Sequence, residues 1–165
     1  MEAYYSMLEL AFFELGEAFK GLADENVWKR PAGPLLSVGE LAGHIAYWEA
    51  VRFAGEGGSP WPDPAKCRVK SPLIDARFAY YTHTVEASPA ALALSADQVH
   101  AELLRVHQES LANLKALNPN PESEPPGLPG WTYRESLKYT VFHVSYHTGQ
   151  IYSVRHLLGE QTPDN

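Results

Sequence analysis

The sequence contains 165 residues, which is enough for one domain with a buried core that needs no disulfides. Its 20 acidic and 13 basic residues leave a net charge of −7 and form no basic stripe, which argues against nucleic-acid binding. The apolar runs are far shorter than a membrane span, the first residues do not resemble a signal peptide, and the single Cys67 cannot form an intrachain disulfide. We therefore expect a cytoplasmic protein without membrane or nucleic-acid partners.

The first predicted helix spans about Glu2 to Ala23. Apolar side chains recur there at intervals of three and four residues, as on the buried face of an amphipathic helix. Two prolines break this pattern in the stretch from Asp24 to Leu36, which predicts a loop. Trp28 in this loop either plugs a helix end or walls a pocket, and both roles are open.

The second long helix begins with a capping box, in which Ser37 is the N-cap residue and Glu40 the third helical residue. His44 lies in the apolar row of this helix, four residues before Trp48. A lone histidine in such a row is more often a hydrogen-bonded core residue than a metal ligand. Its significance therefore depends on the other histidines of the chain.

The region from 55 to 94 is the least regular part of the sequence. From Gly55 to about Asp75 it is rich in Gly, Pro and Ser, which predicts a long surface loop that could cover a site as a lid. The following stretch, Ala76 to Leu94, is predicted to contain a short helix at about Arg77 to Glu86 that ends near Pro89. Neither Cys67 nor His83 has an evident partner, so we interpret them as a solitary loop thiol and an exposed histidine.

A second capping box, Ser95 to Gln98, opens a helix that is expected to extend to about Leu117. His100 and His107 are seven residues apart on one face of this helix. Because charged and polar residues surround both, they are predicted to be surface histidines. The five prolines between Asn118 and Gly130 then predict another loop.

The last helix is opened by a third capping box, Thr132 to Glu135, and is expected to end near Leu158, before Gly159. The polar tail, Glu160 to Asn165, is expected to be frayed. The sequence shows no internal repeat and no convincing strand pattern. Four helices with three clear start signals predict a single all-α domain over residues 1–165, with the architecture of an antiparallel four-helix bundle.

Two histidines of the last helix, His143 and His147, are four residues apart, so their rings project from the same face of successive turns. This face borders the buried row of the helix, where water is scarce. Neutral imidazoles in this arrangement suit zinc, nickel, copper or iron(II). A zincin metalloprotease is disfavoured because Val144 stands where its glutamate is needed. The pair alone is a weak signal, and hydrogen-bonded core histidines without a metal are the alternative.

Two segments of the chain resemble the DinB/YfiT-like superfamily. The first runs from Leu22 to Pro31 and continues from Ser37 to Ala46, and the second is the motif from His143 to Ile151, with Gly149 and Gln150 after the two histidines. The resemblance covers the order and spacing of all four helices. It implies a down-up-up-down four-helix bundle that is commonly a homodimer. It also implies a divalent transition metal, zinc or nickel first of all, whose three ligands are His44, His143 and His147.

Proteins similar to this family include S-transferases that use bacillithiol or mycothiol and a mycothiol-dependent maleylpyruvate isomerase. The resemblance therefore implies a metal-dependent enzyme of thiol S-transferase or hydrolase type, in which the metal activates water or a low-molecular-weight thiol beside a small-molecule substrate. The chain departs from the family at Thr148, where members often carry Arg. A non-catalytic metal-binding or stress-response module that acts as a dimer is the alternative.

The same comparison with the family suggests further site residues. Glu40 is either the acceptor of its capping box or a group that acts as a base or orients His44. No catalytic side chain is assigned, since a metal-bound water or thiol is the expected nucleophile. The residues expected to line the substrate pocket are Trp28, Tyr47, Trp48, Tyr146 and Gln150.

Overall fold

The computed structural model describes residues 1–165 with the exception of 33, 56–62, 80–87, 127 and 164–165. All the secondary-structure elements assigned within the described residues are helical, which confirms the predicted all-α class. The long helices are α1 (Glu2–Phe19), α3 (Val38–Ala54), α5 (Ala96–Leu117) and α6 (Tyr133–Leu157). The short elements are α2 (Asp24–Val27), α4 (Pro89–Leu92) and the 3-10 turns η1 (Pro64–Lys66) and η2 (Ala76–Phe78). In the described residues, no helix is both long enough and apolar enough to span a bilayer.

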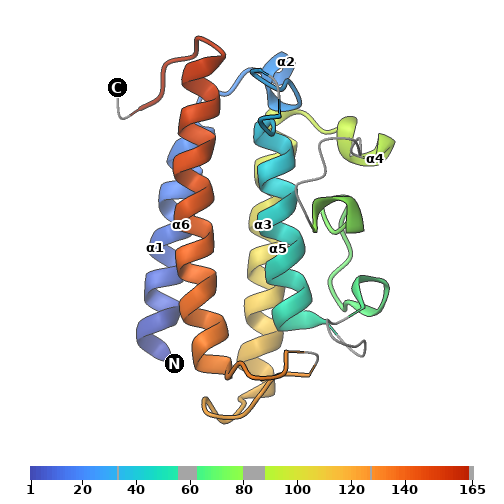
Figure 1. Ribbon diagram of the computed structural model, residues 1–165, viewed down its shortest axis with the longest axis vertical. Coiled ribbons are helices and arrows are strands. Elements are labelled where there is room, and N and C mark those ends of the chain that lie inside the picture. Colours follow the sequence, from blue (N-terminus) through green and yellow to red (C-terminus); the bar gives the residue numbers. More distant parts are fainter. Residues whose placement is uncertain (33, 56–62, 80–87, 127, 164–165) are drawn as a thin grey trace.

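The long helices lie side by side, with α1 against α6 and α3 against α5 (Figure 1). Helix α3 also contacts α6, whereas α1 and α5 touch at fewer points. Helices α1 and α6 begin at the lower end of the molecule in Figure 1, and α3 and α5 begin at the upper end. The contact between α3 and α6 places His44 opposite His143 and His147.

The core of the molecule is formed by the apolar faces that the residue spacing predicts. Burial of these faces removes apolar surface from water and supplies the main stabilising contribution to such a fold. The largest fully buried apolar side chains of the long helices are Leu8, Leu15, Ile45, Leu103, Leu114, Leu137 and Ile151. The site described below lies at the edge of this core and therefore has an environment with little water.

All three predicted capping boxes are present, and each starts a helix. The hydroxyls of Ser37, Ser95 and Thr132 accept hydrogen bonds from the third residue of α3, α5 and α6, and the side chain of that third residue accepts one from the N-cap backbone. The first helix is shorter than predicted, because Lys20 turns to an extended ψ of 122° and Gly21 adopts a φ of +71°. The residues beyond this break form the separate turn α2.

The middle of the chain differs from the prediction. The described part of the predicted surface loop contains η1 and contributes Cys67, which is 1 % exposed and donates a 3.4 Å hydrogen bond to the Ala50 carbonyl. Pro89 begins α4 rather than ending a helix, because Ser88 caps that turn and proline is favoured at the first helical position. Of the predicted helix from Arg77 to Glu86, the structure describes only the part in η2; residues 80–87, including His83, lie outside the described residues.

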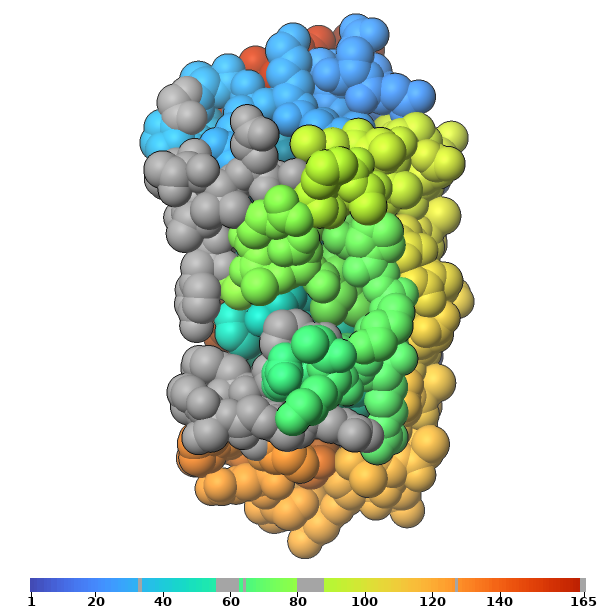
Figure 2. All heavy atoms as spheres, turned by 90° about the vertical axis from the view of Figure 1, so that its right-hand side faces the viewer, coloured from blue at the N-terminus to red at the C-terminus, as the bar shows by residue number. Residues whose placement is uncertain are grey.

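Seen from the side, the segments 63–79 and 88–95 lie over α3, and part of α3 is visible between them (Figure 2). Two glycines of α3 allow aromatic rings to approach the helix closely. A Cβ atom at Gly39 would lie 2.5 Å from the ring of Trp28, and one at Gly43 would lie 2.6 Å from the ring of Phe78. The η2 turn can therefore pack directly on the helix that carries His44.

The prediction that His100 and His107 are surface residues is wrong. His107 is 6 % exposed, stacks on Phe12 with ring centroids 3.7 Å apart, and its Nδ1 lies 2.6 Å from the carboxylate of the buried Glu49. His100 is half-buried and stacks on Phe19. Both rings face α1, a contact between distant parts of the chain that the neighbouring residues of α5 do not reveal.

The chain after α6 is also more ordered than predicted. Arg155 is fully buried and donates hydrogen bonds to the Ala18 and Lys20 carbonyls at 2.7 and 2.9 Å, which satisfies the C-terminal end of α1. Glu160 accepts a 2.7 Å hydrogen bond from Arg155 and another from Asn26. The first residues of the tail are thus fixed to α1 and α2, and only 164–165 lie outside the described residues.

Candidate metal centre

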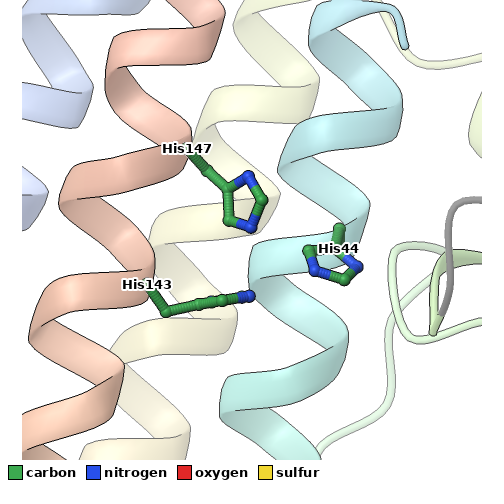
Figure 3. Close-up of side chains that lie close together, drawn as sticks. All are labelled: His44, His143 and His147. Carbon is green, nitrogen blue, oxygen red and sulfur yellow. The ribbon is translucent and has the colours of Figure 1, made fainter. Parts of the chain in front are cut away.

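Three histidines from two helices converge on one point between α3 and α6 (Figure 3). His143 and His147 come from successive turns of α6, and His44 reaches toward them from α3. Ring centroids are 4.9 Å apart for His44 and His143, 4.8 Å for His44 and His147, and 4.4 Å for the pair on α6. The nitrogens available as ligands all lie within 4.8 Å of one another, so the cluster could bind a metal ion.

Burial keeps the three imidazoles neutral. His44, His143 and His147 are 7 %, 6 % and 2 % exposed. Burial, followed by repulsion from the other two rings, lowers the pKa of His143 to about 2. Burial and the charge of His44 lower the pKa of His147 to about 4, and burial is also the main reason that the pKa of His44 is lowered. At neutral pH each ring therefore offers a lone pair, the form in which histidine binds a metal.

Hydrogen bonds at the back of the cluster fix the tautomers of two rings. His44 Nδ1 lies 2.7 Å from the backbone carbonyl of Phe78, and His147 Nδ1 lies 2.6 Å from the side-chain oxygen of Gln150. Since both oxygens can only accept, the Nδ1 atoms carry the protons and donate them. The lone pairs of His44 and His147 are thus on Nε2, an arrangement typical of metal-ligating histidines.

The dimensions of the cluster fit a tetrahedral ion with a small adjustment. Ligand nitrogens bound to one zinc at about 2.0–2.1 Å are roughly 3.4 Å apart. The nitrogens of the cluster are within 4.8 Å of one another, so modest ring rotations would bring them to one ion. Three ligands leave one coordination position for another molecule, as in catalytic rather than structural zinc sites.

The residues predicted to line a pocket fall into two groups. Tyr146 and Gln150 adjoin the cluster: the Tyr146 ring is 5.0 Å from His147, and Gln150 donates a 3.3 Å hydrogen bond to the Tyr146 hydroxyl. Tyr47 and Trp48 instead pack with Phe78 on the η2 side of α3, where Trp48 Nε1 donates to the Ala79 carbonyl at 2.9 Å.

Trp28 belongs to the second group. Its Nε1 donates a 3.0 Å hydrogen bond to the Leu94 carbonyl, and its ring covers Gly39 in the first turn of α3. This position, over the first turn of α3, is consistent with the plug at a helix end, and the role of Trp28 in a pocket stays a prediction. Its ring centroid is 6.5 Å from that of Phe78, so it supports the turn that holds His44.

Glu40 serves the capping box. Its carboxylate accepts hydrogen bonds from the backbone nitrogen of Ser37 at 2.7 Å and from the guanidinium of Arg30. Burial alone would raise the pKa of Glu40, but these hydrogen bonds outweigh it and lower the pKa. The carboxylate is therefore occupied at the start of α3, one turn away from His44.

Sequence reasoning missed three residues beside the cluster. Phe78 accepts the hydrogen bond from His44 through its backbone carbonyl, a group that every residue has and that the residue type therefore cannot predict. The ring of Tyr139 stacks on His143 with centroids 5.8 Å apart, and the Arg52 guanidinium lies over that ring, 4.6 Å from its centroid. The positive charge of Arg52 further lowers the pKa of His44 and His143, so its field reaches the cluster. The four-residue spacing of His44, Trp48 and Arg52 puts all three on one face of α3, and this spacing is the sequence signal that could have identified Arg52.

The family model described as the DinB superfamily matches residues 7–151. This match includes α3 and the part of α6 that carries the two histidines, and hence all three members of the cluster. No curated protein and no solved structure matches the chain.

Proposed function

The chain belongs to the DinB superfamily, and from this premise we propose that His44, His143 and His147 hold one divalent transition metal ion in a metal-dependent enzyme. The reaction we propose is thiol S-transfer or hydrolysis of a small molecule. The observation that supports it is the convergence of three buried neutral imidazoles whose geometry leaves a ligand position open. Zinc and nickel are the proposed ions, because nitrogen donors of this type suit them and calcium or magnesium prefer oxygen.

The protein's own groups orient the site and keep water away from it. The Phe78 carbonyl and Gln150 hold the His44 and His147 rings by their Nδ1 protons, so that Nε2 faces the ligand position. Burial between α3 and α6 keeps the imidazoles neutral at physiological pH. A zinc or nickel ion held there would supply Lewis acidity to a coordinated water or low-molecular-weight thiol.

The architecture that we propose for the whole chain, residues 1–165, is a single DinB-like domain in which α1, α3, α5 and α6 form an antiparallel four-helix bundle. The pairing of α1 with α6 and of α3 with α5 supports the down-up-up-down order. A homodimer is proposed as the working form. Exposed apolar side chains on α1, with Met7, Leu10 and Phe13 at 51 %, 67 % and 63 % exposure, support an association between copies.

A non-catalytic metal-binding module that acts as a dimer is the second candidate. It is favoured by the engagement of Glu40, the acid one turn before His44, with Ser37 and Arg30. The Phe78 carbonyl and Gln150 can orient ligands, but neither can accept a proton as a general base.

Metal content tests the binding part of the proposal. Protein purified without a histidine tag and reconstituted at neutral pH is expected to retain roughly one equivalent of zinc or nickel, because neutral imidazoles bind at that pH. The His147→Ala variant should lose it, whereas His156→Ala, at an exposed position of the same helix, should not. Retention of less than about a tenth of an equivalent by the unaltered protein would reject the metal centre.

Thiol conjugation separates the enzyme from the module. The metal-loaded protein is assayed with bacillithiol, mycothiol and cysteine as donors and a chromogenic electrophile as acceptor, and hydrolysis of small esters is followed in parallel. The enzyme proposal predicts turnover that disappears in His147→Ala. Equal rates of conjugation and hydrolysis in the unaltered protein and in His147→Ala would instead favour the non-catalytic metal-binding module.

A further inference from the structure

Arg52 is a cation held in a fixed position beside the histidine cluster. Its guanidinium carbon lies 5.3 Å from the centroid of the Trp48 ring and 4.6 Å from that of Tyr139, and the same Tyr139 ring stacks on His143. One aromatic ring thus separates the guanidinium from a proposed metal ligand. Contacts of a cation with two ring faces are attractive, and they restrict the side chain to one orientation.

The charge of Arg52 is incompletely neutralised. Its Nη1 atom is buried and has no hydrogen-bond partner among the described residues, although the residue as a whole is half-buried. Burial lowers the pKa of Arg52 to about 10, which leaves it cationic at neutral pH. A buried donor without a partner is unfavourable, and buried guanidinium groups are normally paired with an anion.

Within the part of the chain that the structure describes, no carboxylate forms a hydrogen bond with this guanidinium. Glu49, three residues earlier on α3, is the acid whose charge acts on Arg52. Its Oε1 is 2.6 Å from His107 Nδ1, and its Oε2, like Nη1 of Arg52, is buried without a partner among the described residues. The Tyr139 hydroxyl accepts a hydrogen bond from the Arg52 guanidinium but carries no full negative charge at neutral pH. An oxyanion that enters from outside the protein would therefore find a preorganised donor.

We propose that the small molecule bound at the three-histidine cluster carries a carboxylate and that Arg52 is the residue that binds this carboxylate. The inference rests on the proposed metal-dependent function and adds the chemical class of its ligand. One end of the molecule would occupy the open position at the metal, and its carboxylate would accept hydrogen bonds from Arg52. Arg52 is then a specificity-determining residue, because an uncharged analogue of the same length loses the charge-assisted hydrogen bond.

The test uses two thiols of equal length that differ in one group, 3-mercaptopropanoate and its uncharged amide. Protein loaded with cobalt(II) is titrated with each thiol, and the cobalt–thiolate absorption reports binding without any catalytic turnover. The variant Arg52→Gln removes the guanidinium. Arg105→Gln is the matched control, because it removes an equal charge from the surface of α5, where Arg105 is paired with Glu102 and Glu109.

The proposal predicts that the carboxylate binds roughly ten- to a hundredfold more tightly than the amide, as a hydrogen bond to a charged group allows. This preference should persist in Arg105→Gln and disappear in Arg52→Gln, with the affinity for the amide unchanged. Equal binding of the two thiols by the unaltered protein overturns the inference even if Arg52→Gln does not fold, and so does a preference that survives in Arg52→Gln. Failure of the protein to bind cobalt would instead reject the metal centre, and the inference with it.

Discussion

Replacing Gly43 by alanine tests how the fold positions His44. Gly43 directly precedes His44 in α3, and a Cβ atom at this position would lie 2.6 Å from the ring of Phe78. Phe78 is 5 % exposed and its own carbonyl accepts the hydrogen bond from His44 Nδ1. The ring therefore cannot move away from a new methyl group without disturbing the acceptor that fixes the His44 tautomer.

The expected loss follows from comparison with a second glycine. Overpacking a filled core typically costs about 1–3 kcal/mol, whereas alanine in a helix is about 1 kcal/mol more favourable than glycine. Gly149 in α6 is exposed and a Cβ there meets nothing within 4 Å, so Gly149→Ala receives the helical gain without the clash. The free energy of unfolding of Gly43→Ala should thus lie about 1–3 kcal/mol below that of Gly149→Ala.

Two measurements check this reasoning. Urea unfolding of the metal-free variants gives the difference in stability, and competition with a zinc chelator gives the difference in metal affinity. Loss of an orienting hydrogen bond typically weakens a metal site roughly ten- to a hundredfold, which is the change expected for Gly43→Ala alone. Equal stability of the two variants would show that η2 does not press on α3, and unaltered affinity would show that Phe78 does not orient His44.

Three further predictions concern stability. The free energy of unfolding of the metal-free protein should decrease as the pH falls below about 6.5, by up to about 1.4 kcal/mol per pH unit for each affected ring. The reason is that His143 and His147 bind protons in the unfolded chain at this pH but not in the folded protein, where their pKa values are about 2 and 4. A flat profile of the unfolding free energy between pH 7.5 and 5 would contradict this. Saturation with zinc at a hundredfold excess over its Kd should stabilise the unaltered protein by about 2.7 kcal/mol in the same unfolding assay, and an equal gain in His147→Ala would place the ion elsewhere. Arg155→Met should lower the free energy of unfolding by about 3–5 kcal/mol, because it leaves the carboxylate of Glu160 and two carbonyls at the end of α1 without their donor. His156 is exposed on the same helix, and a loss of stability no greater than that of His156→Ala would argue against this role of Arg155.

The features that the sequence predicts well are local ones. Each capping box is contained within four residues, so Ser37, Ser95 and Thr132 mark helix starts that the structure confirms. The spacing of His143 and His147 likewise fixes their common face on α6. The meeting of this pair with His44 is not local; it was predicted from the resemblance to a family, and the cluster in the structure agrees with it.

The errors arise where a polar side chain finds its partner far along the chain. His107 has polar neighbours in α5, yet Glu49 and Phe12, from two other helices, bury it. Arg155 near the end of α6 satisfies the end of α1, across 137 residues of sequence. Pattern analysis assigns charged residues to the surface because burial is costly without a partner, and it has no means to see that partner.

The cluster itself is costly for a protein that binds nothing there. Burial removes three imidazoles from water, and the hydrogen bonds of His44 and His147 through Nδ1 put their lone pairs on Nε2. Repulsion from the other two rings also disfavours the charged form of His143, and Arg52 has a buried donor nearby that finds no partner in the described part of the chain. A cation among the three lone pairs and an anion beside Arg52 would satisfy both groups at once. Three neutral imidazoles and an incompletely neutralised guanidinium are complementary to such a pair of ligands, and this complementarity supports our proposal of a bound metal with an anionic co-ligand over a hydrogen-bonded core.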